Sequence, residues 1–95
     1  MSDDIQDPLQ NKQLEDLHAV VNRLNIEVAE RDLADSEFPA QSGLCRIRGH
    51  DVIFIDRTLS PAKQIDVLLN ALTRFDLNHI FVADWIRDRL DRMEY

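Results

Sequence analysis

Residues 43–56 read GLCRIRGHDVIFID, and this stretch decides the fold that we expect. Two apolar runs, 43–48 and 51–56, flank the pair Gly49-His50, and glycine at the first central position of a two-residue turn is typical of a type II′ hairpin. The second run is apolar at consecutive positions, as in a central strand covered on both faces, whereas the arginines of the first run indicate one solvated face. We therefore expect an antiparallel hairpin.

A third strand is expected before this hairpin. Residues 26–31 begin with the alternation Ile26-Glu27-Val28-Ala29-Glu30, which is the period of a half-buried strand. Residues 32–42 contain Pro39 and several small polar residues, which favour a surface loop. Together these segments predict a three-stranded antiparallel sheet with strands at about 26–31, 43–48 and 51–56.

Helical patterns surround the predicted strands. Asp7-Pro8 and Ser60-Pro61 each provide an N-cap residue followed by proline at the first helical position. Apolar residues then recur three or four positions apart, as they do again before the C-terminus, where Trp85 falls on the apolar stripe and is expected in the core. We predict helices at about 8–24, 61–74 and 83–94, and hence an α+β fold with the sheet packed against helices.

The composition is that of one globular domain. The chain has 95 residues, 44% of them hydrophobic and 31% charged, which suits one hydrophobic core. Residues 1–6 are mostly polar and acidic, so we expect a disordered tail there and a single domain over 7–95. A chain of this size is expected to be only modestly stable, and burial against a second copy or a partner would add to its stability.

The charge excludes some classes of partner. A formal net charge of −7 repels phosphate backbones and anionic membranes, so we expect neither a nucleic acid nor a membrane as partner. A single cysteine and the lack of a signal-peptide pattern indicate a cytoplasmic protein. The longest apolar runs are also far shorter than the ~20 residues of a membrane span.

Catalytic and metal-binding patterns are weak. Residues 60–63, Ser-Pro-Ala-Lys, match the Ser-x-x-Lys pattern of an activated serine, but the companion motifs are missing and serine before proline is also the usual start of a helix. The soft or borderline metal ligands lack the short spacing of a structural zinc site, and these are His18, His50, His79 and Cys45. We predict no catalytic residue, no metal and no cofactor, while a site assembled by the fold stays open.

Cys45 allows two interpretations. The neighbouring guanidinium of Arg46 can favour a reactive thiolate. Alternation along the strand instead groups Cys45 with Ile47, opposite the arginines, so we expect a small core residue.

One local concentration of cations stands out on this acidic chain: Arg46, Arg48, His50 and Arg57. These are our candidate interaction residues, because a hairpin face can present them to an acidic partner or ligand. Alternatively, the arginines pair with Asp51 and Asp56 or protect a sheet edge from aggregation.

The order of helix, strand, loop, hairpin and helix resembles the minimal metallopeptidase-like domain of the phage-repressor-cleaving ImmA and IrrE proteins. In that family the helix after the hairpin carries His-Glu-x-x-His, which binds zinc and activates water. Here the matching residues 64–72 read QIDVLLNAL, without histidine or glutamate, so no catalytic residue carries over. Residues 43–49, 53–57 and Leu59 also resemble segments of small bacterial proteins to which no activity attaches.

The leading functional hypothesis is a small non-enzymatic bacterial interaction domain, which binds a protein partner or forms a homo-oligomer through its hairpin sheet. One alternative is a degenerate metallopeptidase-like or metal-binding domain that uses residues such as His50, Asp56 and His79. Another is a small acidic chaperone or antitoxin-like protein that shields a basic partner.

Overall fold

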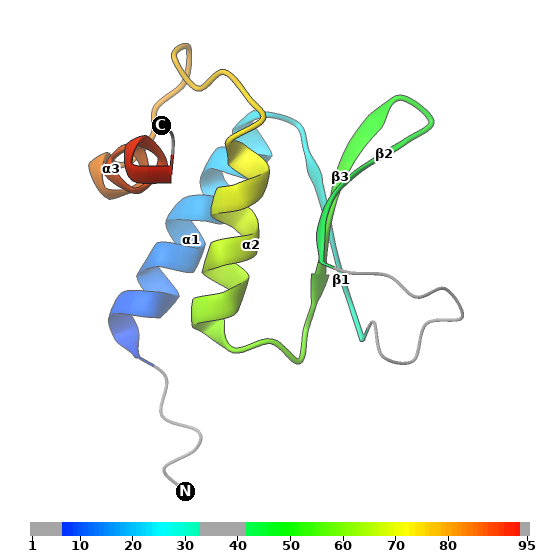
Figure 1. The fold of residues 1–95 in the computed structure, drawn as a ribbon, viewed down its shortest axis with the longest axis horizontal. Helices are drawn as coiled ribbons and strands as arrows, with labels where there is room; N and C mark the ends of the chain where they lie inside the picture. Colours follow the sequence, from blue (N-terminus) through cyan, green and yellow to red (C-terminus); the bar gives the residue numbers. More distant parts are fainter. Residues whose placement is uncertain (1–6, 33–41, 94–95) are drawn as a thin grey trace, which may run out of the picture.

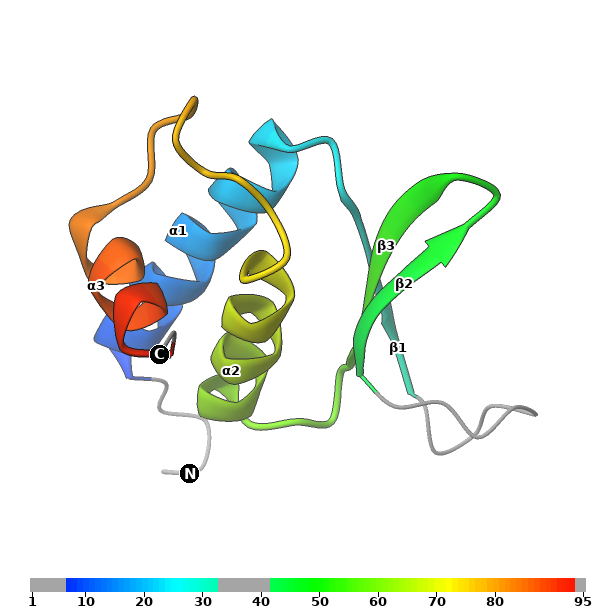
Figure 2. The ribbon, with the colours of Figure 1, turned by 45° about the horizontal axis from the view of Figure 1, so that its top comes forward.

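The computed structural model describes residues 7–32 and 42–93; the predicted tail and most of the predicted loop lie outside them. The elements are, in chain order, α1 (Pro8–Arg23), β1 (Glu27–Arg31), β2 (Gly43–Ile47), β3 (His50–Asp56), α2 (Pro61–Leu72) and α3 (Asp84–Met93). Figures 1 and 2 show α1 and α2 against one face of the sheet, with α3 on their far side. The predicted α+β fold is confirmed. None of the described helices combines the length and apolar character needed to cross a membrane.

The sheet is mixed rather than wholly antiparallel. The strand order is β1-β3-β2, and β2 runs antiparallel to β3. β1, however, runs parallel to β3, with Glu27 opposite Val52 and Arg31 opposite Asp56, so the antiparallel prediction was wrong for this pair. Alternation in the sequence fixes which side chains share a face, but it does not choose the neighbouring strand. β2 runs opposite to both of the other strands, so the chain changes direction twice between β1 and β3, and these two strands run the same way.

The hairpin turn is displaced by one residue from the predicted pair. Ile47 lies opposite His50, so the turn consists of Arg48 and Gly49. Both have positive φ, 52° and 83°, which is the type I′ conformation rather than the predicted type II′. This turn matches the right-handed twist of the strands, but the left-handed backbone of Arg48 costs about 1–2 kcal/mol.

The predicted helix starts are confirmed by their caps. The carboxylate of Asp7 accepts a hydrogen bond from the Leu9 N–H at 2.9 Å, and Ser60 Oγ accepts one from the Lys63 N–H at 3.3 Å. The Ser-x-x-Lys pattern is therefore a helix cap in this structure.

The end of α1 places β1 directly after it. Asn25 has a positive φ of 59°, and its N–H donates to the Asn22 carbonyl while the Ile26 N–H donates to the Val21 carbonyl, both at 3.1 Å. These two bonds form a Schellman motif. The reversal lets Ile26 enter the core immediately after the helix.

The hydrophobic core lies between the sheet and the helices. Ile53 and Ile55 of β3 are 0% exposed, and they share one cluster with Leu17 of α1 and Leu68 of α2. Ile86 of α3 completes this cluster and is also fully buried. The core therefore ties all three helices to one face of the central strand.

A polar contact joins α3 to α1. The indole Nε1 of Trp85 donates to Asp16 Oδ2 at 2.8 Å, and the Lys12 ammonium lies 2.8 Å from Asp16 Oδ1. Hydrogen bonds from Lys12 and then from Trp85 lower the pKa of the Asp16 carboxyl below its ordinary value of 3.8. Trp85 is half-buried against the core, as predicted.

We expect Arg48→Asn to raise the free energy of unfolding by about 0.5–1 kcal/mol, because asparagine tolerates positive φ better than arginine and Asn-Gly is favoured in type I′ turns. Urea denaturation measures the change. Arg46→Asn in the adjoining strand is the matched control, which is expected not to stabilise the protein. Equal stabilisation by both variants would contradict a turn-specific effect.

We expect Asp16→Ala to lower the free energy of unfolding by about 1–2 kcal/mol, because the half-buried indole N–H loses its acceptor. A double-mutant cycle in urea with Trp85→Phe isolates this contact, since phenylalanine keeps an aromatic ring but donates no hydrogen bond. In the Trp85→Phe background the cost of Asp16→Ala should fall clearly. Additive costs would show that the bond does not stabilise the α1–α3 contact.

Candidate functional site

The helices leave one face of the sheet uncovered by any other described element, and we call it the open face (Figures 1 and 2). Its centre is a hollow of about 300 Å³. The residues that line this hollow come from all three strands and the turn: Glu27, Ala29, Arg31, Ile47, Arg48, His50, Val52 and Phe54. Cys45 lies opposite Val52 in the sheet, so it belongs to the same face.

The middle of the open face is apolar. Ala29 and Val52 are each only 5% exposed, yet neither belongs to the core cluster, because they point away from the helices. Phe54 is half-buried beside them, and Ile47 is 44% exposed. The apolar area that stays accessible on this face therefore comes mainly from Ile47 and Phe54.

The fold separates the four predicted interaction residues, all of which are exposed. Arg48 and His50 lie at the hairpin end of the open face. Arg46 instead lies on the helix side, where it lines a hollow with Arg74 from the end of α2. Arg57 follows the opposite end of β3, roughly 20 Å from the turn along the strand. The predicted cluster is thus three separate positions.

Arg31 is a cation of the open face that the sequence did not reveal. It is distant in sequence from the hairpin, and only the parallel pairing of β1 with β3 brings it to the end of the hollow. The sequence pattern did not reveal the direction of β1, and without it Arg31 could not be placed near the hollow.

The alternative pairing of the arginines with neighbouring aspartates is not seen among the described residues. Arg46 lies opposite Asp51 in the sheet register, but within residues 7–32 and 42–93 no ion pair involves Arg46, Arg48 or Arg57. Asp56 Oδ1 accepts hydrogen bonds from the N–H and the hydroxyl of Thr58.

Cys45 is exposed, so the prediction of a small core residue was wrong. The alternation correctly grouped Cys45 with Ile47, but this pair faces the open side. Leu44 points to the helices and packs against the core instead. Arg46 points to the same side as Leu44. It lies beside Arg74, just after the end of α2, where its long charged side chain reaches solvent.

The residues of the metal-binding alternative are not brought together. His50 and Asp56 are the first and last residues of β3, and His79 is exposed in the connection between α2 and α3, 3.8 Å from Asp76. In the described ranges, no three histidine, cysteine, aspartate or glutamate side chains gather as a metal ion would require.

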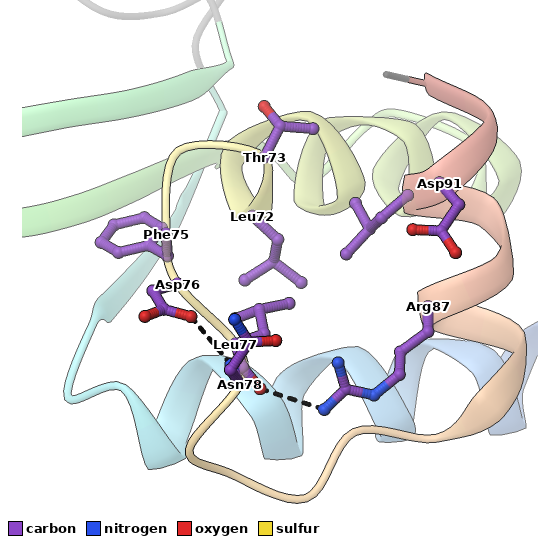
Figure 3. Close-up of a pocket in the computed structure, with 9 residues that line it drawn as sticks. Leu72, Thr73, Phe75, Asp76, Leu77, Asn78, Arg87 and Asp91 are labelled. Atoms are coloured by element: carbon purple, nitrogen blue, oxygen red, sulfur yellow. Dashed lines mark hydrogen bonds between the residues drawn. The ribbon is translucent and has the colours of Figure 1, made fainter. Parts of the chain in front are cut away.

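A second hollow, of about 340 Å³, lies between the end of α2 and α3 (Figure 3). Asp76 and Arg87, two of the polar residues that line it, bond to backbone groups of their own chain. Asp76 Oδ1 accepts from the Asn78 N–H at 2.9 Å, and the Arg87 guanidinium donates to the carbonyls of Leu77 at 3.0 Å and Ile80 at 3.3 Å. These bonds hold the connecting segment against α3, so we assign the hollow a structural role.

We expect Arg87→Met to lower the free energy of unfolding by about 1–3 kcal/mol, because two carbonyls lose their donor. Arg89→Met is the matched control on the same helix, since Arg89 makes only a 3.7 Å ion pair with exposed Asp66. Its cost should stay below about 1 kcal/mol. Urea denaturation of both variants decides, and equal costs would contradict the structural role of Arg87.

Comparisons with protein-family models, with curated proteins and with solved structures find no match to this chain. The resemblance to metallopeptidase-like domains therefore stays a prediction.

Proposed function

We propose that this chain is a small protein-interaction domain that associates with a second copy of itself through the hairpin of β2 and β3. The observation that carries the proposal is an edge strand, β2, whose outer side no other element of residues 7–32 and 42–93 pairs with, directly beside an apolar open face. Unpaired strand edges present rows of N–H and C=O groups that readily pair with another strand.

The two edges of the described sheet differ in their protection. β1 carries Glu27, Glu30 and Arg31 within five residues, and such charges discourage pairing. β2 has the sequence GLCRI, with Arg46 as its single charge and without proline. Its pairing with β3 is continuous, so no bulge twists this edge away. β2 is therefore the edge that association would use.

The open face adds apolar area to the same surface. Ile47 lies on the edge strand and is one of the few large hydrophobic side chains in the described residues that are strongly exposed. Since Ile47 is 44% exposed, burying the rest of its side chain contributes about 1 kcal/mol. Both the backbone of β2 and the side chain of Ile47 thus favour association at the hairpin.

A binding role also fits the use of polar groups elsewhere. In the described part of the chain, Ser60 and Asp7 cap helices, Asp16 joins two helices, and Arg87 holds a connecting segment. Each of these groups already has a structural partner. This supports an interaction domain rather than a reaction centre.

Sedimentation velocity from micromolar to millimolar concentration tests the proposal. We expect a dimer whose fraction rises with concentration. Ile47→Asp should raise the dissociation constant at least about tenfold, because it removes the apolar contact and adds a carboxylate from each copy to the interface of an acidic protein.

Leu9→Asp is the matched control, because Leu9 is another exposed large hydrophobic residue, 63% exposed on α1 and outside the hairpin. It should leave the dissociation constant unchanged. A wild-type protein that stays monomeric at millimolar concentration would refute the proposal, and equal weakening by both variants would exclude the hairpin as the interface.

A further inference from the structure

We infer that two copies join their β2 edges in one antiparallel register, with Cys45 of one copy opposite the partner's Cys45. The result is a continuous six-stranded sheet. This inference rests on the proposed self-association and specifies its geometry, which the register of the hairpin, the side-chain sizes and the charges determine.

Some backbone groups of β2 bond to no other strand of the described sheet. In β3, the Asp56 N–H donates toward the β2 side, to Ser42 Oγ at 2.9 Å, and the next N–H, that of Arg57, donates to the Arg31 carbonyl at the end of β1. Even-numbered residues of β3 therefore bond toward β2. Their partners in β2 are Gly43, Cys45 and Ile47. Because hydrogen-bonding direction alternates along a strand, the N–H and C=O groups of Leu44 and Arg46 point to the free edge.

These outward groups restrict the register in which two β2 strands can pair. Two antiparallel copies related by a two-fold axis can bond only through these outward groups. When Leu44 lies opposite the partner's Arg46, both outward residues of each copy are used and the five-residue strands overlap completely. A register centred on Leu44 or on Arg46 shortens the overlap, and the latter sets two guanidinium groups directly opposite each other, which is unfavourable.

Side-chain sizes on the open face fit this register. Complete overlap places Gly43, which has no side chain, opposite the partner's Ile47, the large exposed residue of the strand. The small Cys45 side chains meet at the two-fold axis. Large side chains thus meet small ones across the new edge, and the two apolar faces become one surface.

On the helix side, the register places the charge of Arg46 near the partner's hollow between β2 and α2. A hollow of about 310 Å³ lies between β2 and α2, beside Leu44. Asp66 and Asn70 of α2 line it together with Arg74, and Asp66 also lies 3.7 Å from Arg89. In the inferred register Arg46 of one copy stands next to the partner's Leu44, and so at the mouth of this hollow. Arg46 makes no ion pair within residues 7–32 and 42–93. Asp66 and Asn70 attract the incoming guanidinium, whereas Arg74 of the same hollow repels it, so the charges on this side permit the register without fixing it.

The single cysteine makes the register measurable. Cys45 is the centre of the overlap and lies between the outward-bonding residues, so it faces the partner's Cys45 as a non-hydrogen-bonded pair, with Cα atoms about 4.5 Å apart. That separation falls within the range of disulfides, and both side chains lie on the same face. Disulfide formation is used here as a probe of proximity.

Oxidation with diamide is the experiment, on the full chain at a concentration where sedimentation shows the dimer. Two Cys45 thiols give two protons and two electrons to diamide, which becomes the hydrazine, and one S–S bond forms between the copies. We expect a crosslinked dimer on a non-reducing gel. Cys45→Ser should abolish the crosslink without changing the sedimentation of the dimer.

A displaced cysteine is the matched control. In the Cys45→Ser/Ile47→Cys variant, the two cysteines would be about 13 Å apart along the strands, so crosslinking should be at least about tenfold slower. Arg46→Pro removes an outward N–H but none that bonds to β3, so it should abolish both dimer and crosslink. Circular dichroism confirms that this variant is folded.

The outcomes separate the two proposals. A dimer that crosslinks equally well or better through the displaced cysteine, or not at all through Cys45, overturns the register and leaves self-association standing. A dimer that survives Arg46→Pro also overturns it. A protein that stays monomeric overturns both proposals.

Discussion

Burial of β3 is the constraint on which the rest of the structure depends. Ile53 and Ile55 are fully buried against the helices, while strands on both sides pair with the β3 backbone. One face and both edges of this strand are thereby used. The other two strands must be edges, and the three helices must share one side of the sheet. The exposed features of the molecule, an open face and a lightly protected edge, follow from this arrangement.

The central strand is apolar on both faces, although the described helices cover only one. Val52 and Phe54 alternate with the two buried isoleucines, and the hollow that they line contains further apolar side chains from the neighbouring strands. A fully alternating strand would have placed polar residues there, as in most one-sided antiparallel sheets. Because Val52 is only 5% exposed, the apolar area that a second layer could bury on this face comes mainly from Phe54 and from Ile47 of β2, which connects the composition of the hairpin to the proposed association.

Local structure was predictable from the sequence, and the choice of neighbours was not. Proline after Asp7 and Ser60 marked the two helix starts correctly, because caps depend on a few adjacent residues. The direction of β1 was missed, because alternation is the same in parallel and antiparallel strands. The turn was misplaced by one residue, since only the pairing of Ile47 with His50 reveals that Arg48 adopts a positive φ. The missed direction of β1 is why Arg31 was not recognised. Cys45 was assigned to the wrong face for another reason, since alternation groups it with Ile47 but does not say which face of the sheet the helices cover.

The charge of the hairpin is compatible with the proposed association, although the protein as a whole is acidic. Residues 43–57 carry three arginines and two aspartates, a formal charge of +1 in a chain of −7. Two copies repel each other most where their carboxylates face, and at physiological salt this repulsion fades beyond about 8 Å. Contact through β2 brings together segments that carry no excess of carboxylates, with α3 on the far side of the other helices (Figure 2). The strand that the core leaves open at its edge is thus also one that a like-charged copy can approach without a local excess of carboxylates.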